Sequence, residues 1–177
     1  MATIRWWRQH SPIGEVVIGA TVDGVCLVGW DDSDDPETLL ADSDHELLNQ
    51  RVDGIAETFD RYFAGEAAAV TTLEVDLCLV TTAFRRKVLS ELHGLATGTN
   101  TTYGQLGAAV GRPKGAQAVG GAVGSNPIPI VIPCHRVLAA DGSLGGFSGG
   151  LPAKRWLLQN EGIEVPDGGW VASHRAD

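Results

Sequence analysis

The sequence is poor in cysteine, in basic residues and in long apolar runs. Its 177 residues include three cysteines, Cys26, Cys78 and Cys134, with no C-x-x-C pair, so neither a disulfide framework nor a four-cysteine zinc site is predicted. No apolar run approaches the roughly 18 residues of a membrane span, and the N-terminus lacks the apolar segment and cleavage site of a signal peptide. We therefore expect a cytoplasmic protein with no membrane partner, in which any thiol chemistry belongs to a single cysteine.

Basic residues are also unevenly distributed. Lysine and arginine number 13 against 22 acidic residues, and the net charge of −9 argues weakly against nucleic acid as a partner. However, residues 1–79 hold four arginines and sixteen acids, whereas residues 80–160 hold eight basic residues and only Glu91 and Asp141 as acids. A polyanion is therefore expected to dock on the second half, although a solvated charge distribution fits equally well.

The first 80 residues are expected to form an α/β domain with a small sheet and one helix. Alternating segments at 3–8, 16–21 and 25–30 predict three strands, and Asp23-Gly24 predicts the turn of a hairpin. An apolar stripe then predicts a helix that ends near Gly65. Its members are Leu48, Val52, Ile55, Phe59 and Tyr62. Cys26 and Cys78 are expected in apolar strands as small buried residues.

Residues 81–163 are expected to form a second, mostly α domain. A helix that carries Phe84, Val88 and Leu92 on one face follows Thr81 and Thr82, which are candidate caps. Helical segments at 102–110 and 116–123, with a turn at 112–115 between them, predict a helix-turn-helix. The second of these helices consists almost entirely of small residues, which indicates either close helix packing or close approach to a nucleic-acid groove.

The strongest chemical signal is the proline-rich segment 126–137, which ends in Cys134-His135-Arg136. A nearby imidazole or guanidinium group would raise the thiolate fraction of Cys134, which is therefore a candidate nucleophile. Adjacent side chains diverge, so we expect His135 to act through one water, with Glu161 orienting its ring. The glycine-rich segment 142–150 would offer backbone N–H groups nearby. The alternative is a structural cysteine beside a surface histidine.

These segments resemble the C-terminal domain of the O6-alkylguanine-DNA alkyltransferases, also called methylated-DNA–protein-cysteine methyltransferases. The resemblance covers residues 81–163 and is carried by Asn126-Pro127, by the motifs IPCHRV at 132–137, FSGGL at 147–151 and KRWLL at 154–158, and by Glu161-Gly162. A weaker similarity at 11–14 and in the following hairpin implies a ribonuclease-H-like fold for the N-terminal domain. Residues 164–177 are expected to be a tail with little structure beyond a contact by Trp170.

The resemblance implies the function and the role of each residue. The helix-turn-helix would dock in the minor groove of double-stranded DNA containing O6-alkylguanine, the damaged base would flip out, and its alkyl group would pass irreversibly to the acceptor Cys134. The other implied catalytic residues are His135 and Glu161 as the water-linked pair, Asn126 as the organiser of the turn, and Tyr103 as a donor to the base. Substrate binding is implied for Val137, Ser148, Gly145 and Phe147, and DNA binding for Gln117, Ala116, Gly120 and Arg136.

Two positions depart from the family pattern, and two other functions stay open. Gln117 stands where an arginine that fills the gap in the base stack is usual, which predicts weaker DNA affinity, and Phe147 stands where tyrosine is common. We expect no cofactor and no metal, and a monomer. The alternatives are a protein that binds alkylated bases with little or no duplex repair, and a cysteine hydrolase that uses Cys134, His135 and Glu161. The number of alkyl groups transferred per protein would separate them.

Overall fold

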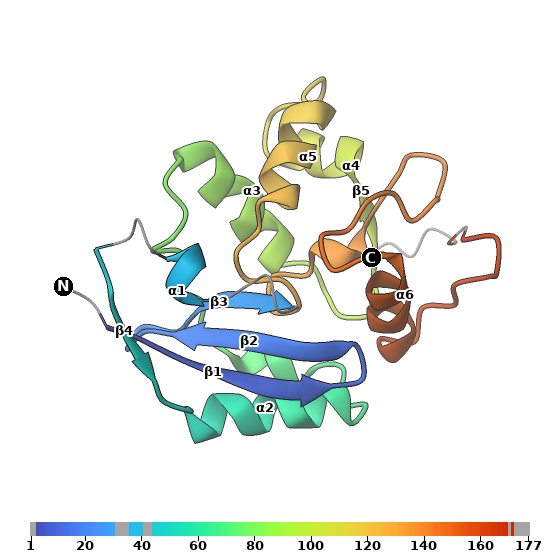
Figure 1. Ribbon diagram of the computed structural model, residues 1–177. Helices are drawn as coiled ribbons and strands as arrows, with labels where there is room; N and C mark the ends of the chain where they lie inside the picture. Colours follow the sequence, from blue (N-terminus) through green and yellow to red (C-terminus); the bar gives the residue numbers. More distant parts are fainter. Residues whose placement is uncertain (1–2, 31–35, 41–43, 170, 172–177) are drawn as a thin grey trace. The chain divides into compact units, whose positions relative to one another are not determined.

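The computed structural model describes residues 3–30, 36–40, 44–169 and 171 (Figure 1). Contacts divide the chain into two compact units, Met1–Leu79 and Val80–Asp177. That residues 1–80 and 81–163 are separate domains stays a prediction. In the described ranges, no helix combines the length and the apolar character that crossing a membrane requires.

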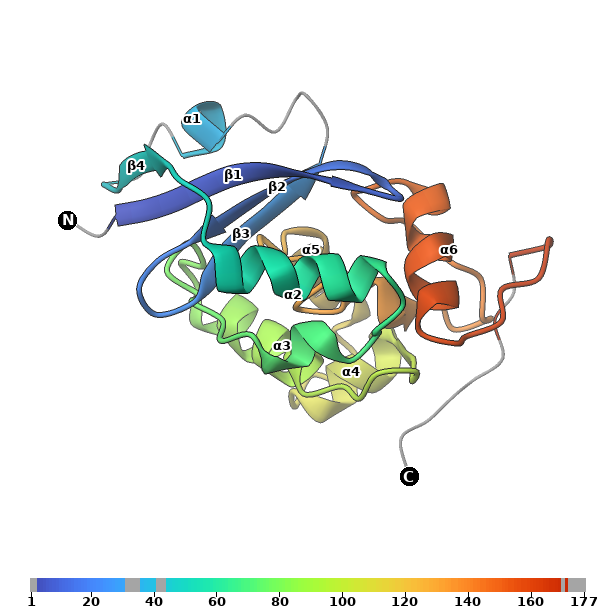
Figure 2. The same ribbon diagram turned by 90° about the horizontal axis from the view of Figure 1, so that it is seen from below.

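The first unit is built on a mixed four-stranded sheet. Strands β1 (Thr3–Ser11), β2 (Gly14–Ala20) and β3 (Val25–Trp30) form an antiparallel meander, and β4 (Glu46–Asn49) pairs parallel with β1, so that the order is β3-β2-β1-β4. Helix α2 (Asp53–Phe63) lies along one face of this sheet (Figure 2). Gln9 of β1 joins the two layers, because its amide donates to the carbonyl of Ala56 at 3.0 Å. The short helices α1 (Pro36–Leu39) and η1 (Ala69–Thr72) complete the unit.

Two predictions for the first unit were partly wrong. Leu48 lies in β4, where it pairs with Arg5, and α2 begins only at Asp53. A four-residue strand is too short to show an alternating pattern of its own, and its pairing with β1 is non-local. Cys26 is buried in β3 as predicted, whereas Cys78 lies at a turn and is half-buried.

The second unit consists mainly of helices whose predicted bounds are confirmed within a few residues. Helix α3 (Ala83–His93) is capped by the Thr82 hydroxyl, which accepts from the backbone N–H of Arg85. Helices α4 (Tyr103–Ala109) and α5 (Ala116–Gly124) follow, and both pack against α3. The remaining elements are the two-residue strands β5 (Thr101–Thr102) and β6 (Val137–Leu138), which pair in parallel, the single turn η2 (Cys134–Arg136), and α6 (Leu151–Asn160).

The described part of the C-terminal tail is packed, contrary to prediction. Val165 and Val171 are buried in one apolar cluster with Leu138 and Leu158. The backbone N–H of Val171 donates to the carbonyl of Gly142 at 2.8 Å, so the tail is tied to the loop that follows β6. The predicted contact of Trp170 lies outside the described residues.

Candidate active site

The turn that presents Cys134 is tied together by one side chain. Asn126 donates from Nδ2 to the carbonyl of Ile132 at 2.9 Å, and its Oδ1 accepts from the backbone N–H of Ile128, also at 2.9 Å. Ile130, at the centre of the turn, is fully buried and has φ of 76°. A β-branched residue in this left-handed region is strained. The surrounding packing and the Asn126 bonds therefore hold the turn in a shape it would not adopt alone.

Cys134 begins the single turn η2 and is nearly enclosed. Only 6% of the residue is exposed. Burial raises the pKa of the Cys134 thiol above its usual value, while a hydrogen bond from Asn126 and the positive charge of Lys154 act in the opposite direction. The lowered pKa that the neighbouring imidazole and guanidinium groups suggested is therefore wrong. At neutral pH the resting sulfur is a thiol that has to lose its proton during reaction.

His135 and Glu161 form a buried pair, as predicted. The His135 Nε2 atom lies 2.7 Å from Oε1 of Glu161, and neither side chain is exposed. Burial lowers the pKa of His135, so the ring is neutral at neutral pH. A carboxylate can only accept, so Nε2 carries the proton and Nδ1 keeps its lone pair. Nδ1 has no hydrogen-bond partner among the described residues. The alternative prediction, a structural cysteine beside a surface histidine, is therefore wrong for His135.

Arg136 faces the interior, and the predicted DNA contact by this side chain is wrong. Its guanidinium donates to both oxygens of Glu161, at 2.7 Å from Nε and 2.9 Å from the second nitrogen, and also to the carbonyl of Leu95. Burial alone would raise the pKa of Glu161, but the donors on His135 and Arg136 outweigh it and lower that pKa to about 2. The carboxylate therefore stays ionised and keeps the imidazole oriented.

Lys154 is a buried cation near Cys134 to which the sequence motifs assign no role. The side chain is fully buried in α6, and its ammonium donates to the carbonyls of Val137, at 2.7 Å, and of Leu144. Burial lowers the pKa of Lys154 to about 8, so the group is mainly charged at neutral pH. It joins β6 to the glycine-rich segment and places positive charge beside the sulfur. A lysine in an amphipathic helix is normally predicted to be solvent-exposed, so no local sequence pattern predicts that Lys154 is buried.

The β5–β6 pair brings Tyr103 to the same region. Thr101 pairs with Val137, which places the start of α4 beside the segment that follows Cys134. Tyr103 is half-buried, and burial together with the negative charge of a Cys134 thiolate raises the pKa of its phenol. The phenol therefore remains a proton donor. Its ring also lies against α5, where a carbon added at Gly120 would meet it at 3.9 Å.

The other predicted residues fall into two groups. Val137 is buried, and its carbonyl accepts from the Lys154 ammonium. The half-buried Phe147 and the exposed Gly145 and Ser148 lie on the segment between β6 and α6. Ala116 and Gln117 are exposed on the first turn of α5, at some remove along the chain from the Cys134 segment.

Comparison with known proteins settles the family. A family model described as the DNA-binding domain of 6-O-methylguanine DNA methyltransferase matches residues 83–163. The methylated-DNA–protein-cysteine methyltransferase of Haemophilus influenzae is 48% identical over 96% of this chain and 92% of its own length. The chain belongs to the methylated-DNA–protein-cysteine methyltransferase family. In this methyltransferase chain, the matched range 83–163 contains all of the predicted site residues.

Solved structures of methyltransferases resemble the whole chain. The O6-methylguanine methyltransferase of Mycobacterium tuberculosis is 30% identical, with a TM-score of 0.74 over 90% of this chain and 93% of that one. A structure of the same organism's protein in complex with DNA is similar to the same degree, with 30% identity, a TM-score of 0.74, and coverage of 89% and 92% of the two chains. Both units of the chain therefore have counterparts in the family.

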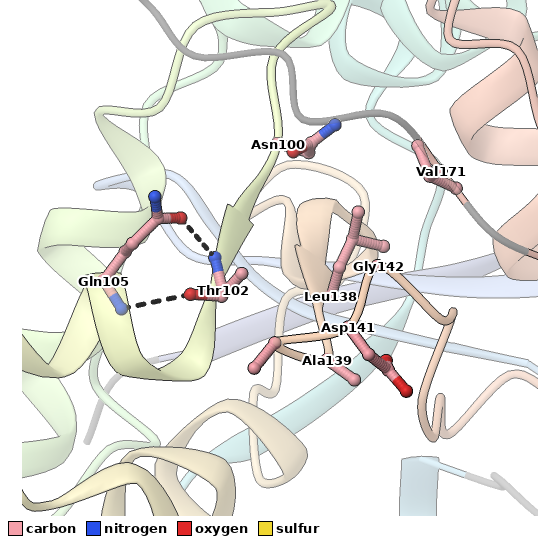
Figure 3. Close-up of a pocket in the computed structure, with 9 residues that line it drawn as sticks. Asn100, Thr102, Gln105, Leu138, Ala139, Asp141, Gly142 and Val171 are labelled. Carbon is pink, nitrogen blue, oxygen red and sulfur yellow. Dashed lines mark hydrogen bonds between the residues drawn. The ribbon is translucent and has the colours of Figure 1, made fainter.

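A cavity of about 390 Å³ in this methyltransferase chain is lined by none of the predicted catalytic residues (Figure 3). It lies between β5, the loop 139–142 and Val171, and Cys134 does not line it. Two of its polar residues, Thr102 and Gln105, bond each other in a capping box, with distances of 3.0 and 3.2 Å. Among the described residues, no three His, Cys, Asp or Glu side chains gather as metal ligands do.

Proposed function

We propose that this chain repairs double-stranded DNA by moving an alkyl group from O6 of guanine to Sγ of Cys134, once per protein molecule. The observation that carries the proposal is the buried His135–Glu161 pair, whose histidine directly follows the buried Cys134 in the chain. It orients a neutral imidazole whose Nδ1 can accept a proton. The relative that is 48% identical is named for this same transfer, which supports the assignment.

Each proposed catalytic group has a defined part in the transfer. The thiol proton passes through one water to Nδ1 of His135, and Sγ attacks the alkyl carbon as the bond between that carbon and O6 breaks. The electron pair of the broken bond stays on O6 of guanine, which accepts a hydrogen bond from the Tyr103 phenol, and the base takes up one proton from solvent, so that neutral guanine is restored in the DNA. His135 then returns its proton to solvent. The carbon–sulfur bond is stable, so the protein reacts once.

Lys154 and the main chain are proposed to shape the substrate pocket. The Lys154 ammonium stabilises the thiolate as it forms and holds the carbonyl groups of Val137 and Leu144 in place. The main chains of Val137 and Ser148 would read the guanine edge, with Gly145 and Phe147 forming the rest of the pocket. Because a buried ammonium offsets negative charge more strongly than an exposed one, its effect on the sulfur is expected to be large.

We further propose that α4 and α5 act as a helix-turn-helix on the minor groove. Outside their own helix and chain neighbours, no atom of the described residues lies within 4 Å of a carbon added at Gly121 or Gly124, so internal packing does not require glycine at these two positions of α5. A groove roughly 6 Å wide does require them. The similar Mycobacterium tuberculosis protein has been solved in complex with DNA, which supports DNA as the partner. In the proposed arrangement, Ala116, Gln117 and Gly120 lie on the DNA side of the helix.

Two finer structural assignments belong to the same proposal. The mixed sheet of the first unit, covered by α2, fits the ribonuclease-H-like fold that the resemblance implies. The active form is further proposed to be a monomer.

The mass of the intact protein tests the transfer directly. After incubation with excess duplex containing O6-methylguanine, the parent is expected to gain one methyl group per chain and then to stop. Cys134→Ala should gain none, whereas Cys78→Ala, which also removes one thiol, should react like the parent. An unmodified parent, or an adduct on another cysteine, would overturn the proposal. Continuing turnover would instead indicate the hydrolase.

A further inference from the structure

Two of the three cysteines lie together in the first unit, and the proposed alkyl transfer uses neither of them. Cys26 is fully buried in β3, Cys78 is half-buried at the turn that follows residue 76, and both are free thiols. Cys78 packs against the apolar cluster that contains Cys26. We call Cys26 and Cys78 the thiol pair. Folding thus brings together two sulfurs that are far apart in the sequence.

An irregularity of β3 gives Cys26 its position. Val25 and Leu27 each pair with a residue of β2, whereas Cys26 between them has no partner on that strand. Such an extra residue is a β-bulge, which redirects the side chains around it. In a regular strand Cys26 and Leu27 would point to opposite faces of the sheet, but both are buried in one apolar cluster with Trp6. The bulge therefore turns the Cys26 thiol into the cluster on which Cys78 packs.

Backbone hydrogen bonds hold Cys78 near this bulge. Val25 donates to the carbonyl of Glu74 and accepts from the N–H of Asp76, each at 2.9 Å. This segment therefore runs along the edge of β3, next to the residue that precedes Cys26. The backbone N–H of Cys78 then donates to the Asp76 carboxylate at 2.9 Å. The turn that carries Cys78 is thus fixed to the strand that carries Cys26.

The two thiols also interact directly. The hydrogen bond between them lowers the pKa of Cys78 and raises that of Cys26, and burial raises the pKa of Cys26 further. Cys78 is therefore the first of the two to ionise, with Cys26 as the donor to its sulfur. The thiolate is the form that reacts with oxidants, so the more accessible sulfur is also the more reactive one. Cys134 differs in both respects, because it is nearly enclosed and burial raises its thiol pKa.

We propose that the thiol pair is a modification site, at which a peroxide oxidises Cys26 and Cys78 to one reversible disulfide and leaves Cys134 reduced. The sulfurs are already in contact, so joining them requires only a small change of the side chains. The disulfide would link β3 to the turn at Cys78 and so close a long loop, which stabilises a folded chain. The inference goes beyond the proposed function and does not depend on it.

The oxidation balances with one molecule of hydrogen peroxide. The Cys78 thiolate attacks one peroxide oxygen, the O–O bond breaks, and hydroxide leaves and takes up the proton that Cys78 had released. Cys78 is then a sulfenic acid. The Cys26 sulfur attacks Sγ of Cys78, the S–O bond breaks, and the departing hydroxide takes up the Cys26 proton. The two thiols lose two electrons to the peroxide, which is reduced to two molecules of water. A dithiol reductant reverses the reaction by exchange.

Counting the free thiols after peroxide treatment tests the site. The full chain is reduced, freed of reductant, exposed to a small excess of hydrogen peroxide, and then denatured and alkylated with iodoacetamide. The mass of the intact parent should show three labels before peroxide and one afterwards, with the remaining label on Cys134. A dithiol reductant should restore all three. The matched control is Cys134→Ala, which should lose both of its labels at the parental rate.

Variants of the pair identify the order of the two steps. In Cys26→Ala the reaction should stop at the sulfenic acid of Cys78, which dimedone traps as an adduct. In Cys78→Ala, which replaces a half-buried side chain and should fold normally, Cys26 should keep its label. A parent that retains three labels while added glutathione is oxidised would overturn the inference. A disulfide that includes Cys134, or the loss of the Cys134 label before the others, would overturn it as well.

Alkyl transfer by the oxidised chain is measured separately. The disulfide form should still gain one methyl group from duplex containing O6-methylguanine, because Cys134 keeps its thiol. Transfer that is lost only after oxidation would contradict the selectivity for the pair. If neither the reduced nor the oxidised chain accepts a methyl group, the proposed function fails, whereas the labels on Cys26 and Cys78 still decide this inference.

Discussion

Replacing Glu161 by glutamine tests both the stability and the chemistry of the site. The carboxylate is fully buried and accepts three hydrogen bonds, one from His135 and two from Arg136. Glutamine keeps the shape but loses the charge, which leaves the Arg136 guanidinium buried without a counter-ion. Removing one partner of a buried pair costs about 3–5 kcal/mol.

The pKa of Glu161 leads to a similar magnitude. Its displacement from 4.5 to about 2 corresponds to about 3 kcal/mol, at 1.36 kcal/mol for each pKa unit. Since domains are stable by about 5–15 kcal/mol, Glu161→Gln should lose a large fraction of its stability and still fold at low temperature. Urea unfolding followed by tryptophan fluorescence measures this loss.

A second substitution separates stability from catalysis. Adding Arg136→Met to Glu161→Gln removes the buried charge that lost its partner, so most of the stability should return. The ring of His135 still lacks its carboxylate, so the rate of alkyl transfer should stay about 10²–10⁴-fold below the parent. The rate is measured as methylated protein against time, with duplex in excess.

Two results would refute this reasoning. If Glu161→Gln unfolds at the parental urea concentration, the pair with Arg136 contributes little to folding. If the double variant transfers the methyl group at the parental rate, the carboxylate does not orient His135 for catalysis.

Four further predictions follow from the same structure. The Glu161 pKa is lower in the folded than in the unfolded chain, so its stabilisation is present above pH 4.5 and is lost as the pH falls towards about 2; urea unfolding across this range should show a steeper loss in the parent than in Glu161→Gln. Asn126→Ala leaves a backbone donor and a backbone acceptor of the turn without partners, which should lower the free energy of unfolding by about 2–4 kcal/mol, and an unchanged value would contradict the role of Asn126. Gly121→Ala should stabilise the helix by about 0.5–1 kcal/mol and yet weaken duplex binding, whereas Gly107→Ala should destabilise the protein because its added carbon meets backbone; thermal unfolding and a binding titration distinguish the two. Gln117→Arg should bind duplex more tightly than the parent, and equal or weaker binding would contradict the prediction.

Features with a local physical cause could be predicted from residues alone. The hydroxyl of Thr82, and the capping box formed by Thr102 and Gln105, provide hydrogen-bond partners for backbone N–H groups at the starts of two helices. Because these groups would otherwise be unpaired, α3 and α4 begin where predicted. The alternation of apolar and polar residues within each segment likewise predicted the positions of β1, β2 and β3. The prolines before Cys134 excluded an ordinary strand, and the turn that replaces it is found in the structure. The family motif then indicated which cysteine, histidine and carboxylate belong together.

Features that depend on distant neighbours could not be predicted. The spacing of Leu48 from Val52 fits a helix, but Leu48 lies in β4, because its backbone pairs with Arg5 at the edge of β1. The sequence predicted that Arg136 is a surface cation. In the structure its guanidinium is buried, because it donates to the carboxylate of Glu161, 25 residues further along the chain. No pattern in the sequence assigns a role to Lys154, because the carbonyls that hold it lie on other segments of the chain.

The sequence by itself determined where α3 and α4 begin, which half carries the positive charge, and which thiol is the candidate acceptor, since these depend on bonded neighbours and on composition. The tertiary structure alone decided the protonation of the site. Burial raises the pKa of Cys134 and lowers that of His135, while Arg136 keeps Glu161 ionised. The physical reason is that the free energy of a charge depends on the water removed around it and on the groups brought near it, and folding sets both.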